Sequence, residues 1–153
     1  MKLGFTGTQN GMTPPQLLKV AQFIIANKLS ESHSGDCIGA DKEFLTLVQM
    51  GNKNKNFNHI KTIGHIPDND SKRAFGAYDE ERIPKSYLDR NHDIVDESDT
   101  VIATPFEKDE QLRSGTWATI RYAKKQGKPV TIFLPDGTIQ CFNQKKSSEE
   151  WSK

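Results

Sequence analysis

Along the chain, short apolar runs alternate with longer stretches in which apolar residues recur every three or four positions. The short runs predict strands, and the helical spacing predicts helices between them. We expect strands over residues 2–6, 31–34, 61–66, 100–104, 129–134 and 138–142. We expect helices over residues 13–29, 42–50, 86–95 and 114–126. This alternation is typical of an α/β fold in which helices cover both faces of a mostly parallel sheet.

Two further segments complete the predicted organisation. Pro135-Asp136-Gly137 is a turn signal that predicts a C-terminal hairpin, with residues 138–142 folding back on the preceding strand. Residues 67–84 lack apolar periodicity and are rich in Asp, Arg and Lys. Connections of this length are usually functional or disordered. We therefore expect this segment to cover or border a ligand pocket and to tighten when ligand binds, with Lys72 and Arg73 as mobile phosphate partners.

Composition favours a single domain with a polar surface. The chain has 153 residues, of which 34% are hydrophobic and 27% charged, and we expect a domain over residues 1–143 followed by a polar tail over 144–153. The formal charge of +1 argues against a protein that coats nucleic acid by bulk charge. No apolar run approaches the roughly 18 residues of a membrane span, and the N-terminal apolar stretch is too short for a signal peptide.

Cysteine and histidine usage indicates no metal centre. The two cysteines, Cys37 and Cys141, are far apart and show no CxxC spacing, and the four histidines show no metal-binding spacing. We expect a cytoplasmic protein that binds no membrane, holds no metal and needs no cofactor.

Three glycine-bearing turns are the candidate sites of chemistry. Parallel sheets bind ligands beyond the carboxyl ends of their strands, where strand order reverses. In the first turn, GFTGTQNG, the residues Gly7, Thr8 and Gln9 would let the backbone approach a phosphate. Its spacing is not that of the dinucleotide fingerprint GxGxxG, and a tight turn chosen for backbone geometry is an equal alternative.

The second turn, HSGDCIGAD, carries two carboxylates. Asp36 follows Gly35, and Asp41 lies at the start of the next predicted helix. Such carboxylates can hold ribose hydroxyls or cap the helix, and capping by Asp is common. Because Asp36 lies further from the helix, we expect it to face a ligand.

The third turn, LRSGTW, has the strongest local signal for an anion. Ser114 and Thr116 offer hydroxyls at a helix start, Gly115 leaves the backbone amides accessible, and Arg113 supplies a counter-charge. An ordinary serine cap beside a packed Trp117 is the alternative reading.

Three more polar residues are candidate ligand-binding groups. Arg73 lies in the charged segment 67–84, where basic side chains are often merely solvated. Arg90 and Asn91 come shortly before the strand that leads into the third turn. All three would suit a phosphorylated ligand.

The motifs together resemble the SLOG superfamily of small Rossmann-like domains. The similar segments are GFTGTQNG, SGDCIGAD, RNHDIVDESDTVIATP and RSGTWATIRYAKKQGKPVTIF, so the resemblance extends to about Gly137. That superfamily includes the lonely-guy (LOG) phosphoribohydrolases, the core of DNA-processing protein A (DprA) and nucleotide-sensing domains of bacterial defence systems. The last segment is most similar to DprA, in which a Ser-Gly-Ser/Thr turn is followed by Thr and Arg at the positions of Thr119 and Arg121. The resemblance implies a Rossmann-like three-layer sandwich, a nucleotide-type pocket and a homodimer.

One departure leaves catalysis open. The phosphoribohydrolases place a catalytic Glu three residues after the Thr of their Gly-Thr turn, whereas this chain has Thr119 there. A threonine cannot stabilise an oxocarbenium-like centre as a carboxylate does. A hydrolase would need another carboxylate, for which Asp36, Glu107 and Glu110 are the candidates.

Three functions follow as hypotheses. The first is sensing or sequestration of a nucleotide-derived phosphorylated ligand, such as an ADP-ribose-like signal, in phage or bacterial defence. The second is an N-glycosidase that acts on nucleoside monophosphates. The third, DprA-like binding of single-stranded DNA, is less favoured because it needs clustered basic and aromatic residues, and the basic residues here are scattered.

Overall fold

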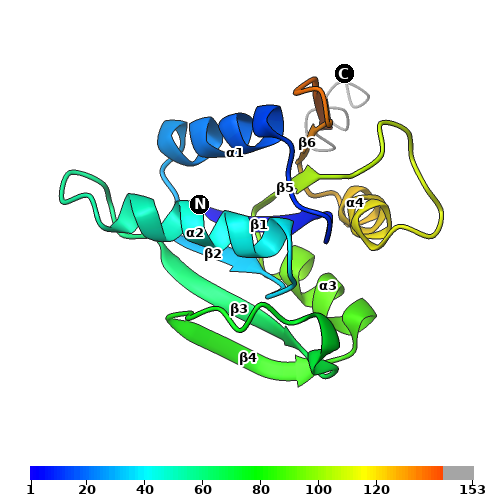
Figure 1. Ribbon diagram of the computed structural model, residues 1–153, viewed down its shortest axis with the longest axis horizontal. Coiled ribbons are helices and arrows are strands. Elements are labelled where there is room, and N and C mark those ends of the chain that lie inside the picture. The colour runs from blue at the N-terminus through cyan, green and yellow to red at the C-terminus, as the bar shows by residue number, and fades with distance from the viewer. Residues whose placement is uncertain (143–153) are drawn as a thin grey trace, which may run out of the picture.

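The structure, a computed structural model, describes residues 1–142 and has an α/β fold built on one sheet (Figure 1). The strands are β1 (Lys2–Gly7), β2 (Glu31–Ser34), β3 (Lys61–Pro67), β4 (Glu80–Lys85), β5 (Thr100–Thr104), β6 (Val130–Phe133) and β7 (Ile139–Phe142). The helices are α1 (Pro14–Ala26), α2 (Ala40–Asn52), α3 (Tyr87–Asp96) and α4 (Gly115–Lys125), with a short 3₁₀ helix, η1 (Asp70–Lys72). The predicted tail over residues 144–153 lies outside the described residues.

The strand order β4-β3-β2-β1-β5-β6-β7 confirms the predicted fold class. Strands β1 to β6 pair in parallel, and β7 pairs with β6 in the antiparallel sense as the C-terminal hairpin. From β1 the chain first builds outward through β2, β3 and β4, and then returns to place β5 on the other side of β1. The order therefore reverses between β1 and β5, which is where open α/β sheets bind ligands.

Helices cover both faces of the sheet. One apolar cluster joins α1 and α2 to one face and includes Val20, Phe44 and Ile102. The other joins α3 and α4 to the opposite face and includes Val101, Ala103 and Ile120. Because alternate residues of β5 supply the two clusters, this strand is buried on both sides, as its continuous apolar run TVIAT predicts.

Helix α1 begins as the sequence predicts, and its first turn also fixes the loop after β5. Thr13 and Gln16 form a capping box, in which each side chain accepts a hydrogen bond from the other residue's amide. The Gln16 side chain is 1% exposed and donates 2.9 Å hydrogen bonds to the carbonyls of Pro105 and Phe133. A single buried amide thus ties the ends of β5 and β6 together.

Residues 67–84 differ from the expected unstructured connection. They contain η1 and most of β4, an edge strand whose residues are exposed except for the half-buried Arg82. Because β4 buries no face, its sequence EERIPK shows no apolar alternation, and Ile83 is 81% exposed. The start of β4 is held instead by Asp79 and Thr62, which exchange two 2.9 Å hydrogen bonds between their amides and side chains. The other predicted helices and strands are present with slightly different ends.

No helix within residues 1–142 is both long and apolar enough to cross a bilayer.

Candidate functional site

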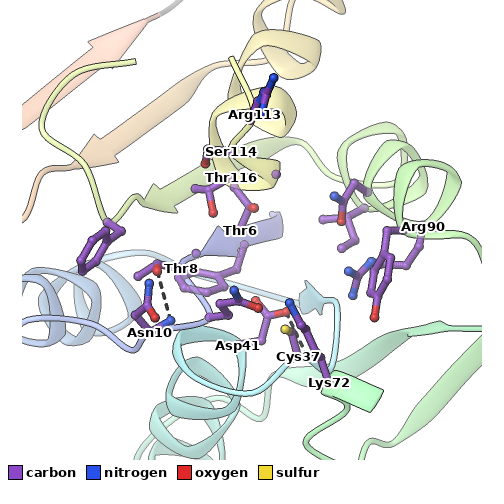
Figure 2. A pocket seen from close by; sticks show the side chains of 18 of the residues that line it. Thr6, Thr8, Asn10, Cys37, Asp41, Lys72, Arg90, Arg113, Ser114 and Thr116 are labelled. Carbon is purple, nitrogen blue, oxygen red and sulfur yellow. Dashed lines mark hydrogen bonds between the residues drawn. The ribbon is translucent and has the colours of Figure 1, made fainter. Parts of the chain in front are cut away.

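A cavity of about 530 Å³ lies at the carboxyl edge of the sheet, beside the ends of β1 and β5. Figure 2 shows α4 on one side of it, α3 on a second side, and the loop before α2 together with Lys72 on a third. The predicted ligand-binding residues that line the cavity are Gly7, Thr8, Gln9, Arg90, Asn91, Arg113, Ser114, Gly115 and Thr116. The structure thus brings the first and third turns together at one site.

The first turn is shaped by packing as well as by its place on the cavity. A Cβ on Gly7 would overlap the side chains of Thr104 and Ala40, so only glycine fits between β5 and α2. The buried Thr8 donates its amide to the Thr104 carbonyl at 3.0 Å, and its hydroxyl accepts a hydrogen bond from the Asn10 amide at 3.1 Å. The tight-turn interpretation therefore holds for Gly7, whatever ligand role it also has.

The third turn presents the start of α4 to the cavity. Ser114 caps the helix, and its hydroxyl accepts a 3.2 Å hydrogen bond from the Trp117 amide. Within residues 1–142, no acceptor meets the amides of Gly115 and Thr116, and the space around Gly115 is open. Arg113 is exposed at the cavity rim. The serine cap thus coexists with two amides that are free for an anion.

Arg90 of α3 is a buried cation on the cavity wall. Its side chain is 6% exposed, its guanidinium donates to the Gly35 carbonyl, and it lies 5.3 Å from the ring centre of Tyr87. Its Nε is buried and has no hydrogen-bond partner among the described residues. Since a buried donor without a partner is costly, an acceptor placed at this nitrogen would stabilise the site.

Asp41, the second carboxylate of the HSGDCIGAD turn, and Lys72, the neighbour of Arg73, also line the cavity. Asp41 in the first turn of α2 accepts a 3.1 Å hydrogen bond from the Cys37 amide. Burial raises the pKa of Asp41 to about 6, and the opposing effect of Arg90 only partly offsets this. Lys72 at the end of η1 reaches the cavity because its carbonyl accepts a 2.9 Å hydrogen bond from the Ile38 amide. The structure thus places at the cavity the carboxylate that also begins α2 and the first residue of the basic pair Lys72-Arg73.

Asp36 does not face the cavity, contrary to expectation. Its carboxylate is fully buried and accepts hydrogen bonds from the Arg73 Nε at 2.7 Å, the Gly76 amide at 2.8 Å and the Tyr78 hydroxyl at 3.4 Å. Arg73 is absent from the cavity lining for the same reason, and its guanidinium lies over the Phe75 ring. Gly35 also lies outside the cavity lining, at a place where a Cβ would overlap the Arg90 guanidinium. The contacts of Asp36 therefore hold the segment after β3 against the turn after β2.

Of the three candidate catalytic carboxylates, Glu107 alone lines the cavity. The exposed Glu110 pairs with Arg121 at 2.7 Å. Thr119, which stands where the phosphoribohydrolases have their Glu, is 3% exposed and donates its hydroxyl to the Gly115 carbonyl at 2.9 Å. Thr119 therefore stabilises the first turn of α4 and does not reach the cavity.

A second polar cluster lies apart from the cavity. His33 Nδ1 and His65 Nε2 are 2.8 Å apart, and both side chains are almost fully buried. With Glu97, they bring three possible metal-ligating atoms within 4.8 Å of one another, a cluster that sequence spacing could not reveal because the histidines lie on neighbouring strands. Arg82 donates two hydrogen bonds to Glu97 Oε1, at 2.7 and 3.0 Å, and so balances the charge of this carboxylate. Burial lowers the pKa of both histidines, that of His65 to about 4.

The sequence matches no protein-family model, and no curated protein is significantly similar to it. The likeness to the SLOG superfamily thus stays a prediction from the motifs.

Proposed function

We propose that this protein binds a nucleotide or nucleotide-derived phosphorylated ligand in the cavity and senses or sequesters it, as a SLOG-like domain would. The observation that carries the proposal is the buried Arg90, whose Nε has no partner among the described residues and which lines the same cavity as the free amides of Gly115 and Thr116. A buried guanidinium and a helix N-terminus are each suited to a phosphate.

The distribution of charge around the cavity supports an anionic ligand. Arg90 is buried, while Lys72 and Arg113 are exposed at the rim, where they can follow a ligand as it enters. Arginine can meet two phosphate oxygens at once, and the helix dipole adds about 0.3–1 kcal/mol at the α4 N-terminus.

The size of the cavity supports a ligand larger than inorganic phosphate. Its volume of about 530 Å³ lies within the range of small-molecule sites, which is roughly 300–1,000 Å³. Tyr87 and Phe106 add aromatic surface to a lining that is otherwise largely polar. A phosphate held by α4 and Arg90 would leave room for a sugar and a base, and an ADP-ribose-like signal is one candidate.

Calorimetry with matched ligands tests this proposal. We expect nucleoside 5′-monophosphates and ADP-ribose to bind the purified protein, and the corresponding nucleosides to bind at least tenfold more weakly. Mass spectrometry of the ligand that is retained during purification would identify the natural ligand. Equal affinity for a nucleoside and its 5′-phosphate would contradict the proposal.

A second candidate function, N-glycosidase activity, is favoured by one observation. Asp41, whose pKa is raised to about 6, and Glu107 line the same cavity, so two carboxyl groups are available in place of the missing Glu. A raised carboxyl pKa suits a general acid near neutral pH.

Chromatography that measures the release of free base from nucleoside monophosphates tests for N-glycosidase activity. Asp41→Asn should abolish any such release. Glu110→Gln, which alters a carboxylate outside the cavity, should leave it unchanged. If no base is released by the wild type, the protein is a binding protein only.

A further inference from the structure

We infer that Phe106 and Glu107 form a base-recognition subsite in the cavity, and that the base it fits best is guanine. This inference rests on the proposed function and names the part of the ligand that is not phosphate. It is carried by a buried carboxylate oxygen without a partner and by an exposed aromatic ring, both in the loop after β5.

Glu107 is an acceptor that lacks a donor. Its Oε1 is buried and has no hydrogen-bond partner among residues 1–142. Burying such an oxygen is unfavourable unless something donates to it. A phosphate cannot fill this role because it would repel the carboxylate. An uncharged part of the ligand that carries N–H or O–H donors would supply what Glu107 lacks.

The backbone that leads into this subsite is held in place before any ligand arrives. The Pro105 carbonyl accepts a 2.9 Å hydrogen bond from the buried Gln16 side chain, and the Thr104 carbonyl accepts one at 3.0 Å from the Thr8 amide. Both contacts immediately precede Phe106 and Glu107. The loop therefore enters the cavity from a fixed position, which lowers the cost of ordering it on binding.

Phe106 supplies a surface for a flat ring. It lines the cavity and is 60% exposed, unlike the phenylalanines of the core. Aromatic side chains of this kind stack on nucleobases, and stacking accepts any base because every base has a π face. We assign selectivity among bases to Glu107, which follows Phe106 directly in the chain and lines the same cavity.

The chemistry of the carboxylate favours guanine. Two adjacent donors, the N1–H and N2–H₂ groups of guanine, match the two oxygens of one carboxylate in a bidentate arrangement. Adenine places an acceptor, N1, beside its amino group, and this acceptor would repel the second oxygen. The subsite thus favours a guanine nucleotide over adenine-bearing ligands, including ADP-ribose.

Calorimetry with GMP, IMP, AMP and ribose 5-phosphate tests the inference in the wild type and in three variants. We expect GMP to bind at least tenfold more tightly than AMP, with IMP, which lacks the N2 amino group, in between. Glu107→Gln should weaken the binding of GMP about tenfold and leave the binding of AMP unchanged. Glu110→Gln, a matched change in the same loop outside the cavity, should alter neither ligand. Phe106→Leu should weaken the binding of all three nucleotides and leave the binding of ribose 5-phosphate unchanged.

Three outcomes would overturn the inference. If GMP and AMP bind equally well and Glu107→Gln weakens both alike, the carboxylate does not read the base. If wild-type protein binds 2′-deoxy-GMP more weakly than GMP by the same factor by which Glu107→Gln weakens GMP binding, Glu107 holds the ribose instead. If ribose 5-phosphate binds as tightly as GMP, the base makes no contribution, although the phosphate site of the proposed function stands. Failure of every phosphorylated compound to bind would overturn the proposed function as well.

Discussion

The Asp36 carboxylate and the Arg73 guanidinium meet at 2.7 Å, and this ion pair joins the turn after β2 to the segment after β3. Around it, the amides of Ile38 and Ala74 donate to the carbonyls of Lys72 and Asp36, each at 2.9 Å. These contacts hold the segment that brings Lys72 to the cavity. Asp36 is therefore a positioning residue for the cavity wall.

Replacing this buried carboxylate should destabilise the protein more than replacing an exposed neighbour. Asp36→Asn leaves Arg73 without its charged partner, and breaking such a pair costs about 3–5 kcal/mol when both groups are buried. The lower end applies because the Arg73 side chain is 16% exposed. Denaturant unfolding would measure the loss, and hydrogen exchange should show faster exchange at the amide of Gly76.

Asp70→Asn is the matched control. Asp70 also faces Arg73, at 3.8 Å, but its side chain is 72% exposed, and such pairs contribute about 0–1 kcal/mol. If Asp36→Asn and Asp70→Asn cost the same free energy of unfolding, Asp36 does not hold the segment.

Removing the Arg113 side chain should weaken phosphate binding without affecting the fold. A charge-assisted hydrogen bond contributes roughly 1.5–3 kcal/mol, and solvent screening at this exposed position reduces it. We therefore expect Arg113→Ala to weaken a nucleoside monophosphate about tenfold in calorimetry, and to leave binding of the nucleoside unchanged. Lys108→Ala, which removes an exposed cation outside the cavity, should change neither. If Arg113→Ala lowers the affinity for the nucleoside and for its monophosphate equally, Arg113 is not a phosphate ligand.

Anion binding should strengthen as pH falls, because Asp41 gains a proton. Burial raises the pKa of Asp41 to about 6, so its negative charge in the cavity wall disappears as pH falls below that value. Sulfate is the suitable probe, since its own charge is constant between pH 8 and pH 5. We expect its affinity to rise over this range in the wild type and to change much less in Asp41→Asn. A wild-type affinity that is independent of pH would contradict this role for Asp41.

The buried histidine pair should make the fold sensitive to acid. The pKa of His65 falls from its ordinary value of 6.5 to about 4, chiefly because of burial and then because of His33 and Arg82, despite the opposing charges of Glu97 and Asp93. Between pH 6.5 and about pH 4, His65 takes up a proton in the unfolded chain but not in the folded chain. The free energy of unfolding therefore falls as pH falls through this range. Above pH 6.5 this contribution to stability is fully present.

Urea unfolding between pH 7.5 and pH 4.5 measures this effect as the difference between wild type and variant. Comparison with a variant is needed because Asp41, with its raised pKa, shifts stability in the opposite direction over part of the same range. His65→Gln should remove part of the acid sensitivity. His59→Gln, at a histidine whose side chain is 63% exposed, should retain all of it. Identical pH profiles for these two variants would exclude the buried pair as the source.

Sequence patterns predict most of the fold because most elements bury at least one face. Strand β5 is buried on both sides, and its continuous apolar run predicts it. The capping box and apolar stripe predict α1. Strand β4 left no such pattern because it is an exposed edge. Periodicity reports burial, so an element without a buried face is missed.

The site was predicted in part, and the errors concern side-chain direction. Turn motifs placed the backbone of Gly7 and Gly115 at the cavity, since both turns follow parallel strands. They could not show that Asp36 points into the protein or that Lys72, and not its neighbour Arg73, lines the cavity. Lys72 ends the 3₁₀ helix η1 and Asp36 has a left-handed backbone with φ 55°, so the regular alternation of a strand does not tell which side chain faces the ligand.

The most direct test of the account is a titration of isotope-labelled protein with IMP and, separately, with inosine, followed by amide NMR. If the cavity holds a phosphate at the start of α4, IMP will shift the amides of Gly115 and Thr116 together with that of Thr8, and inosine at the same concentration will shift them little. Equal shifts with inosine, or IMP shifts confined to residues outside the cavity, would contradict it.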